Sequence, residues 1–541
     1  MTHRPFAITL DVGSSRANHT GSWRTERPEY VRRLPPCNGA CPAAEDIQGW
    51  LFHAESGDYE SAWRTIMRDN PFPAVMGRVC YHPCETACNR GTLDEAVGIN
   101  SVERFLGDLA IERDWRIAVE APETGSRVLV VGAGPSGLSA AYHLRRLGHE
   151  VEIRDAAPAA GGMMRYGIPR YRLPREVLDA EIARIAAMGV VFVLGSPVGD
   201  IEAAMSEGHF DAAFLAVGAG VGRRAHVPAG DAARVIDAVA FLHGMEDEDP
   251  PLIGRRVVVY GGGDTAVDAA RTVRRLGAEP VIVYRRTRDR MPAQDLDVEE
   301  ALDEGVMARW LSTIRHIDPG TVTVERMELD ASGFPQPTGE TETLAADTVI
   351  LALGQDSDLA LVEGAADIEV ADGVVRVGPD MMTGRAGVFA GGDMVPSERT
   401  VTTAVGHGRL AARNVDAWLR GVTHVPSPRP PLAAFDTLNT WYYTDAPRTV
   451  RLHLEAARRA TTFDEVVAGL DESNALFEAR RCLSCGNCFE CDNCYGVCPD
   501  NAVIKLEPGE GYRFDLDFCK GCGICVEECP CGAIEMGPEP A

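Results

Sequence analysis

The sequence predicts an α/β protein in which two Rossmann-like nucleotide-binding units lie between two cysteine-rich segments. At residues 127–148 an apolar strand runs into a glycine-rich turn and then a helix, and the same order recurs at residues 256–277. The sixteen cysteines fall into two groups, five at residues 37–88 and eleven at residues 482–531. In a reducing compartment such groups indicate metal ligands rather than disulfides.

Composition narrows the class of protein. A chain of 541 residues with 45% hydrophobic residues should form several globular domains. The net charge of −27 argues against nucleic acid and anionic membranes as partners and suits docking to a basic protein. The sequence has no apolar run long enough to span a membrane and no signal-peptide core at its start. We therefore predict a cytoplasmic protein without a membrane span.

The first cysteine-rich segment covers residues 35–124 and follows a polar, arginine-rich arm at residues 1–34. Apolar residues at helical spacing follow its first two cysteines, and another helix is expected from residue 99. This segment is therefore predicted to be a helical metal-binding domain. Its candidate thiolate ligands are Cys37, Cys41, Cys80, Cys84 and Cys88.

The first nucleotide unit occupies residues 125–249. A strand at 128–131 is apolar throughout, as expected for a strand buried on both faces, and a helix follows at 138–147. A second strand at 150–154 ends at an acidic residue that can accept a hydrogen bond from a ribose hydroxyl, while the helix N-terminus faces a pyrophosphate. The alternative is a glycine-rich loop without a ligand. The candidate nucleotide-binding residues are Gly132, Gly134, Pro135, Ser136, Gly137 and Asp155.

Paired glycines follow this unit in the run GGMMRYGIP at residues 161–169. With the preceding motif, this run resembles the flavin-binding half of the glutamate synthase small subunit and its relatives. The resemblance implies that the nucleotide is FAD rather than NAD. It also implies that Gly162 and Met163 lie close to the FAD.

The second nucleotide unit is placed at residues 250–352. Its strand at 256–260 leads into the turn GGGDTA and a helix at 266–276, and a further strand covers 280–284. That strand ends in arginines instead of the acidic residue an NAD site prefers, so NADPH is favoured over NADH because a guanidinium can pair with a 2′-phosphate. The alternative is a solvated arginine face. The candidate residues are Gly261, Gly263, Asp264, Thr265, Ala266, Arg285 and Arg286.

The chain is then expected to return to the flavin domain with a strand at 348–353, and residues 353–423 form its second part. The run GVFAGGD at 387–393 is similar to the second signature of two-dinucleotide flavoproteins. That resemblance implies that Gly392 and Asp393 contact the flavin and that a helix from Thr402 to residue 419 runs beneath the isoalloxazine. It also implies an FAD domain with an inserted NAD(P)H domain.

A proline-rich linker with helical segments spans residues 424–480, and a cysteine-rich tail spans 481–541. Two CxxCxxCxxxCP runs in the tail predict a bacterial-type two-cluster ferredoxin, in which the fourth cysteine of each run binds the other cluster. A zinc site is the alternative. One cluster would be bound by Cys488, Cys491, Cys494 and Cys529. The other would be bound by Cys519, Cys522, Cys525 and Cys498.

The N-terminal cysteines resemble the helical iron–sulfur domain shared by the glutamate synthase small subunit and dihydropyrimidine dehydrogenase. This resemblance implies one [4Fe–4S] cluster on Cys41, Cys80, Cys84 and Glu103. It implies a second on Cys37 and Cys88, but the family's leading CxxC is missing. The run EARRCLSC at 478–485 resembles that lead-in, so we hypothesise that the tail folds back and supplies Cys482 and Cys485. Alternatively, these two are extra thiols; Cys531 is left over.

Together these parts predict an iron–sulfur flavoprotein that transfers electrons between NAD(P)H and a protein redox partner through FAD and three to four [4Fe–4S] clusters. Hydride transfer needs no general acid or base, so no catalytic residue is nominated. The resemblance implies an electron-transfer subunit of a larger complex, with a ferredoxin, a 2-oxoacid oxidoreductase or a sulfite reductase-type enzyme as partner. The alternatives are a free-standing ferredoxin:NADP reductase and a relay subunit that is inert with NAD(P)H alone.

Overall fold

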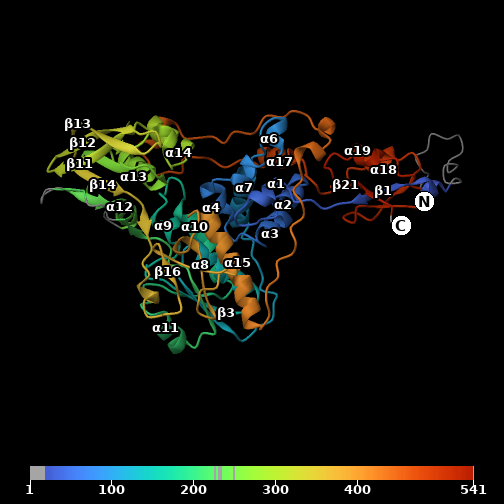
Figure 1. Ribbon diagram of the computed structural model, residues 1–541, viewed down its shortest axis with the longest axis horizontal. Coiled ribbons are helices and arrows are strands. Elements are labelled where there is room, and N and C mark those ends of the chain that lie inside the picture. Colours follow the sequence, from blue (N-terminus) through green and yellow to red (C-terminus); the bar gives the residue numbers. More distant parts are fainter. Residues whose placement is uncertain (1–18, 224–226, 230–233, 248–249, 540–541) are drawn as a thin grey trace.

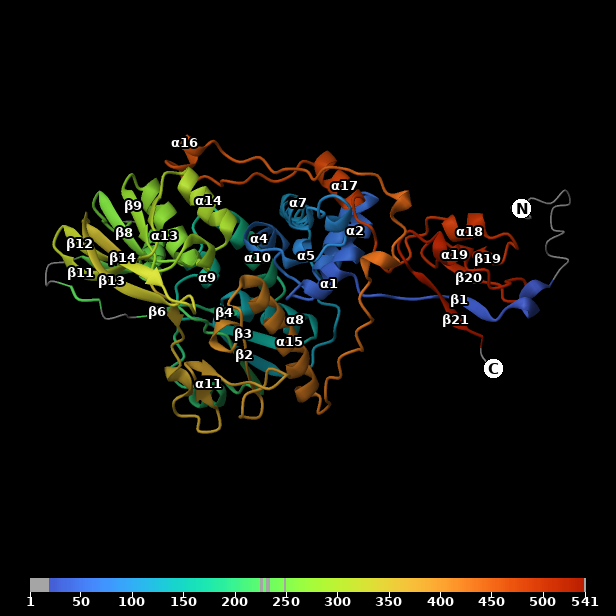
Figure 2. The same ribbon diagram turned by 45° about the horizontal axis from the view of Figure 1, so that its top comes forward.

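The computed structural model describes residues 19–223, 227–229, 234–247 and 250–539. The chain is elongated, with the second nucleotide unit at one end and the cysteine-rich tail at the other (Figure 1). The first nucleotide unit and the helical domain lie between them, and the described part of the N-terminal arm lies beside the tail (Figures 1 and 2). No helix within these ranges is both long enough and apolar enough to cross a bilayer.

The first nucleotide unit is built on a parallel sheet with strand order β18-β5-β2-β3-β4. Because β18 comes from beyond the second unit, the second unit is inserted into the first, as predicted. Helices α8 and α15 pack together so closely that a Cβ at Gly408 would lie 2.2 Å from the carbonyl oxygen of Ser136. The strands are β2 (Arg127–Val131), β3 (Glu150–Arg154), β4 (Val191–Val193), β5 (Ala212–Leu215) and β18 (Val388–Ala390). The helices are α8 (Pro135–Arg146), α9 (Met163–Tyr166), α10 (Arg175–Ala186), α11 (Ile201–Gly208) and α15 (Val401–Leu419).

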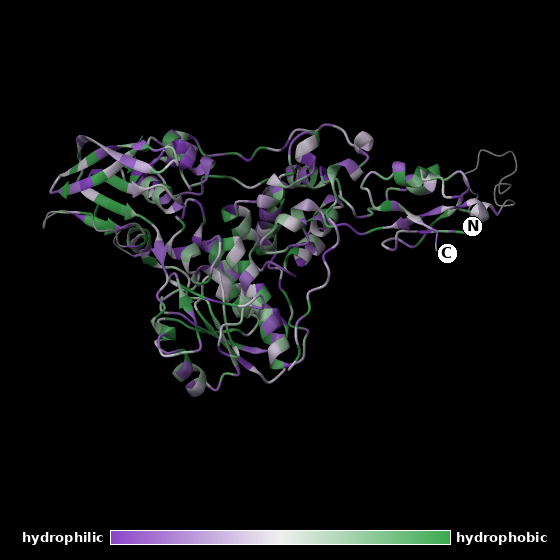
Figure 3. Cartoon of the chain, in the orientation of Figure 1, coloured by the Kyte–Doolittle hydropathy of each residue, from purple (hydrophilic) through white to green (hydrophobic). Residues whose placement is uncertain are grey.

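The second nucleotide unit has its own parallel sheet, in the order β10-β9-β8-β14-β7, whose strands are largely hydrophobic (Figure 3). Its members are β7 (Val235–Asp237), β8 (Arg256–Gly261), β9 (Glu279–Val283), β10 (Met307–Arg309) and β14 (Thr348–Ala352). Helices α12 (Ala238–His243), α13 (Asp264–Arg275) and α14 (Asp295–Asp303) belong to this unit. An antiparallel sheet of β11 (Ser312–Asp318), β12 (Thr321–Leu329) and β13 (Pro335–Ala345) adjoins it.

Two sequence expectations need correction here. Strand β7 pairs with β14, so the second unit begins before the boundary predicted at residue 250. Strand β14 also pairs with β8, so the strand expected to return the chain to the flavin domain lies inside the second sheet. The true crossing is a two-stranded ribbon of β6 (Val221–Gly222) and β15 (Gln355–Asp356). Short strands of this kind carry too little hydrophobic pattern to be recognised from sequence.

The helical domain packs around buried side chains that include Trp50, Trp63 and Leu106. Gly107 lets the helices at residues 73–79 and 99–112 pack closely, since a Cβ at Gly107 would lie 2.2 Å from the backbone nitrogen of Ala74. The domain comprises α1 (Pro36–Ala40), α2 (Ile47–Glu55), α3 (Tyr59–Ile66), α4 (Pro73–Val79), α5 (Pro83–Thr86), α6 (Arg90–Leu93) and α7 (Ile99–Glu112).

The predicted linker is a long strap that runs over the top of the molecule (Figures 1 and 2). From the tail it passes the helical domain to reach the second nucleotide unit at α16 (Ala456–Arg459). There the Nδ1 atom of His453 lies 3.2 Å from a carboxylate oxygen of Glu300. The strap then returns as α17 (Glu472–Arg480), which packs on α2 and α7. The strap therefore contacts both the second nucleotide unit and the helical domain.

The tail contains α18 (Asn493–Val497), β19 (Val503–Lys505), β20 (Tyr512–Phe514), α19 (Ile524–Glu527) and β21 (Ile534–Pro538). The described part of the N-terminal arm is ordered onto this tail. Its strand β1 (Glu26–Tyr30) pairs antiparallel with β21 along its whole length. Arg24 donates two hydrogen bonds of 2.6 and 2.7 Å to Glu539. The arm thus serves as an edge strand of the tail.

Candidate functional site

The turn at the start of α8 allows backbone to approach backbone. Gly132 has a φ of +107°, which favours glycine. A Cβ at Gly162 would lie 2.7 Å from the Cα of Gly134, so the paired glycines press directly on the turn. Asp155 closes the arrangement by accepting hydrogen bonds from the backbone nitrogens of Ala133 (2.5 Å) and Ala157 (2.7 Å). Its carboxylate retains lone pairs that can accept from a ribose.

Several groups around this turn fit a dinucleotide. Ser136 is 3% exposed, and its hydroxyl has no partner within the described residues, as expected where a phosphate completes the site. Pro135 is the first residue of α8 and has no backbone N–H. The N–H groups of the next residues point out of the N-terminal end of the helix, where a phosphate can accept from them. A Cβ at Gly392 would lie 3.1 Å from the Cβ of Ser136, so the second flavin signature lies directly against the first turn. Met163 begins α9 directly after the paired glycines.

Two titratable groups flank the second signature. Burial raises the pKa of Asp393, and Arg399 partly offsets that shift. Burial lowers the pKa of His407, whose Nδ1 accepts a 3.2 Å hydrogen bond from the nitrogen of Gly392. That acceptor role requires a neutral imidazole with its proton on Nε2. Burial therefore disfavours the charged form of each group beside the turn.

The second nucleotide unit opens on a cavity of about 860 Å³. The glycine turn and the arginines predicted to read the 2′-phosphate share its wall, together with Tyr284 and Arg290. Neither Arg285 nor Arg286 has an ion pair in the described part of the chain, and the Nε of Arg286 is buried without a partner. The predicted residues on the wall are Gly261, Gly263, Asp264, Thr265, Arg285 and Arg286. Ala266 instead lies fully buried in α13.

The first cysteine group of the helical domain surrounds a buried carboxylate. Burial raises the pKa values of Cys41, Cys80 (to about 12) and Cys84, and Glu103 raises each of them further. Burial also raises the pKa of Glu103, which accepts a 3.0 Å hydrogen bond from Asn70. Buried thiols and a buried carboxyl become stable anions when a metal supplies positive charge. These four groups stay the candidate ligands of the cluster that the family resemblance implies.

A hydroxyl connects this group with the first nucleotide unit. Thr402, in the first turn of α15, donates a 3.1 Å hydrogen bond to the sulfur of Cys80. The backbone nitrogen of His82 donates to the same sulfur at 3.2 Å. Hydrogen bonds to ligand sulfurs are one means by which proteins set cluster potentials. The helix expected beneath the flavin thus contacts a predicted cluster ligand directly.

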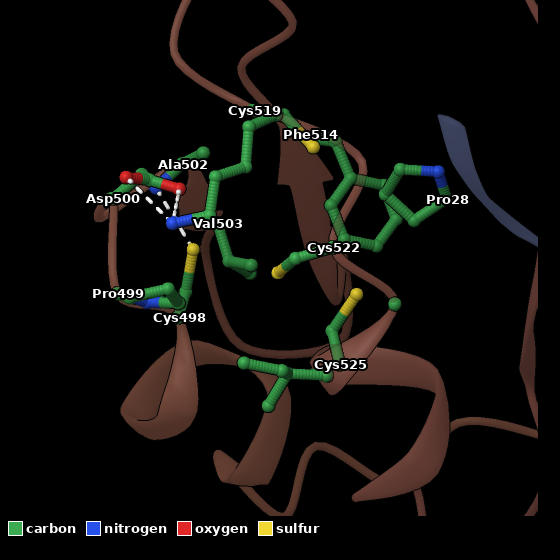
Figure 4. Close-up of a pocket in the computed structure, with 13 residues that line it drawn as sticks. Pro28, Cys498, Pro499, Asp500, Ala502, Val503, Phe514, Cys519, Cys522 and Cys525 are labelled. Carbon is green, nitrogen blue, oxygen red and sulfur yellow. Dashed lines mark hydrogen bonds and ion pairs between the residues drawn. The ribbon is translucent and has the colours of Figure 1, made fainter. Parts of the chain in front are cut away.

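In the tail, four predicted ligands line one cavity: Cys498, Cys519, Cys522 and Cys525 (Figure 4). The backbone nitrogen of Ala502 donates a 3.2 Å hydrogen bond to the sulfur of Cys498. The second tail set is Cys488, Cys491, Cys494 and Cys529. Burial raises the pKa of Cys494, and the thiols of the other three cysteines raise it further. None of the sixteen cysteines, all of which lie within the described ranges, is in a disulfide, so each is available as a thiolate ligand.

Some residues beside the sulfurs were not foreseen from the sequence. The hydroxyl of Tyr30 lies 3.3 Å from the sulfur of Cys494, across the pairing of the arm with the tail. Arg24 donates a 2.9 Å hydrogen bond to the carbonyl of Cys519. Asn70 bridges Glu45 and Glu103. No local motif marks these side chains, because each meets its partner only through the fold.

Comparison with known proteins covers most of the chain. The family described as pyridine nucleotide-disulphide oxidoreductases matches residues 126–408. The family described as dihydropyrimidine dehydrogenase domain II, 4Fe–4S cluster, matches residues 31–115, and a 4Fe–4S binding domain matches residues 512–535. These matches agree with the order of units that the sequence predicts.

Three curated relatives are similar along much of their length. The NADP(+)-dependent formate dehydrogenase subunit beta of Moorella thermoacetica is 36% identical, over 83% of this chain and 70% of that protein. The NADPH-Fe(3+) oxidoreductase subunit beta of Geobacter sulfurreducens is 33% identical, over 85% and 77%. The glutamate synthase [NADPH] small chain of Escherichia coli is 33% identical, over 71% and 89%.

Proposed function

We propose that this chain, which belongs to the pyridine nucleotide-disulphide oxidoreductase family, moves electrons between NADPH and a protein redox partner. It is an FAD- and NADP-dependent oxidoreductase with 4Fe–4S domains. The observation that carries the proposal is the hydrogen bond from Thr402 to Cys80, because it connects the flavin side of the molecule to a predicted cluster ligand. The cysteine-rich tail would be the point of exit or entry for electrons.

In this proposal the residues of the two nucleotide units hold and orient the cofactors. The turn at Gly132 and Gly134 and the N-terminus of α8 would bind the FAD pyrophosphate, and Asp155 would accept from the ribose. Arg285 and Arg286 would pair with the 2′-phosphate of NADPH. When held by these residues, the flavin would supply the conversion between a two-electron hydride from NADPH and single electrons for [4Fe–4S] clusters.

The proposed partner is a protein, and the chain would be the electron-transfer subunit of a larger complex. Two relatives carry the name of a beta subunit, one of an NADP(+)-dependent formate dehydrogenase and one of an NADPH-Fe(3+) oxidoreductase. The net charge of −27 favours a partner whose docking face is basic. Free thiols in this number favour a reducing compartment, so we place the complex in the cytoplasm. The second candidate is a free-standing ferredoxin:NADP reductase. The ferredoxin-like tail favours it, because such a tail could pass electrons onward without a partner subunit.

An anaerobic titration of the FAD-loaded protein with NADPH, and separately with NADH, tests this function. We expect NADPH to bleach the flavin and the iron–sulfur absorbance together, and NADH to require much higher concentrations. If neither nucleotide reduced the flavin, the hydride-transfer function would be wrong and a passive relay subunit would replace it. Catalysis with an added ferredoxin but with no partner subunit would favour the free-standing reductase.

A further inference from the structure

The helical domain and the start of the cysteine-rich tail share the wall of one cavity. Four cysteines line it, Cys37 and Cys88 from the helical domain and Cys482 and Cys485 from the start of the tail. The remaining wall is mostly apolar and includes Leu51, Val97, Ile99 and Leu483. Such a lining excludes water, which suits a buried iron–sulfur cluster.

Cys37, Cys88, Cys482 and Cys485 line the same cavity, so one group bound there could contact all four. Two polar donors are directed at these sulfurs. The backbone nitrogen of Ser484 lies 3.4 Å from the sulfur of Cys482, and the side-chain nitrogen of Asn89 lies 3.5 Å from that of Cys485. N–H donors of this kind stabilise thiolates that carry the negative charge of a cluster.

Protein contacts alone fix the tail segment in this position. Arg481, 2% exposed, donates to the backbone carbonyls of Ala446 and Ala96, both at 3.1 Å. Arg90, 3% exposed, donates to the carbonyl of Arg481 at 2.7 Å, and both guanidinium groups contact Asp94. A carboxylate between two buried arginines neutralises charge that would otherwise be costly to bury. Contacts that involve no sulfur therefore help to hold the tail cysteines beside the helical domain.

Chain spacing places this cavity between the other cysteine groups. Cys37 lies in the short helix α1 and Cys41 is its C-cap residue, so this one helix carries a cysteine of each of the two groups of the helical domain. On the other side, Cys485 lies only three residues before Cys488, the first ligand of the tail ferredoxin. Consecutive ligands that serve different clusters hold those clusters close together, as in two-cluster ferredoxins. This cavity therefore lies on the path from the flavin to the tail.

We propose that Cys37, Cys88, Cys482 and Cys485 together bind a fourth [4Fe–4S] cluster, assembled from the two ends of the chain. All four are thiolate ligands, the common set for this cluster. The helical domain alone provides only half of the ligands, which explains why its motif is incomplete. The role of this cluster in joining the flavoprotein body to the tail rests on the proposed function. The presence of the cluster does not, because the iron content of the protein measures it directly.

The test compares the anaerobically reconstituted full-length protein with a Cys482→Ser/Cys485→Ser variant and a Cys531→Ser control. Cys531 is a buried tail cysteine that the cavity does not include. We expect the double variant to lose about four iron atoms and one EPR signal of the reduced protein, and the control to lose neither. Cys37→Ser, at the other end of the chain, should remove the same signal. Unchanged iron in the double variant would overturn the proposal.

Two further measurements keep the proposal testable and separate it from the proposed function. Iron and sulfide analysis of the wild-type protein distinguishes four clusters from three without any variant, and a value of three contradicts the site. In the double variant, NADPH should still bleach the flavin while the tail clusters stay oxidised. If NADPH failed to reduce the flavin in the wild-type protein as well, the proposed function would fall, but the iron count would still decide the site.

Discussion

Replacing Arg286 with alanine should remove most of the preference for NADPH over NADH. Arg286 is half-buried on the wall of the 860 Å³ cavity, and its Nε has no partner within the described residues. A hydrogen bond between two charged groups contributes about 2 kcal/mol, which corresponds to about 30-fold in Kd. Arg285 is exposed, so solvent screening should limit its loss to about 1 kcal/mol, or about fivefold.

The assay is calorimetric binding of NADP⁺ and NAD⁺ to the oxidised protein, which avoids turnover. We expect Arg286→Ala to weaken NADP⁺ about 30-fold and to leave NAD⁺ within about twofold, because only NADP⁺ carries the 2′-phosphate. Arg288→Ala is the matched control, since Arg288 pairs with Glu299 at 3.0 Å and lies outside the cavity wall. An equal loss for both nucleotides in Arg286→Ala would refute the 2′-phosphate assignment.

Three further changes test other parts of the molecule. Gly162→Ala should abolish FAD retention, because its new Cβ would lie 2.7 Å from the backbone of the glycine turn. Gly199→Ala is the control and should retain FAD, because nothing lies within 4 Å of its new Cβ. The FAD content after gel filtration measures both variants. Tyr30→Phe should lower the reduction potential of the cluster bound by Cys494, because it removes a 3.3 Å hydrogen-bonding contact; an EPR-monitored titration that found no shift would contradict this role. Asp94→Asn should cost about 3 kcal/mol in urea unfolding at neutral pH. Burial alone would raise the pKa of Asp94, but its hydrogen bonds lower that pKa overall. The contribution of Asp94 to the free energy of unfolding is therefore complete above its ordinary pKa of about 4 and is lost in acid. Equal destabilisation by Asp94→Asn at all pH values would contradict this.

Local patterns predicted several helices and strands well. The strand at 150–154 and the helix that begins near residue 99 lie where the sequence placed them, because each is a strong apolar pattern bounded by turn or cap residues. The arginines after β9 line the cavity, whereas Ala266 is buried in α13. The nucleotide-binding roles of these residues stay predictions. The strand β7 was missed as part of the second sheet, since three residues give no period from which to assign a partner.

Contacts between distant parts of the chain were harder to foresee. The arm at residues 1–34 has no periodicity, yet its strand β1 completes the tail by pairing with β21. Strand partners far apart in sequence leave no local signal, because pairing depends on backbone groups that every residue carries. The meeting of Cys482 with Cys37 was suggested by a missing motif, whereas Arg90 and Asp94, which hold the tail there, were not. Buried ion pairs are recognised only once burial is known.

The most direct test of the electron path is the number of electrons that NADPH delivers to the fully reconstituted protein under anaerobic conditions. Coulometric titration, with EPR detection of each reduced cluster, measures this number. We predict uptake beyond the pair of electrons that FAD accepts, with one more electron for each cluster whose potential lies within reach of NADPH. Uptake that stopped at the flavin, with every cluster oxidised although dithionite reduces them, would contradict a path from the nucleotide to the tail.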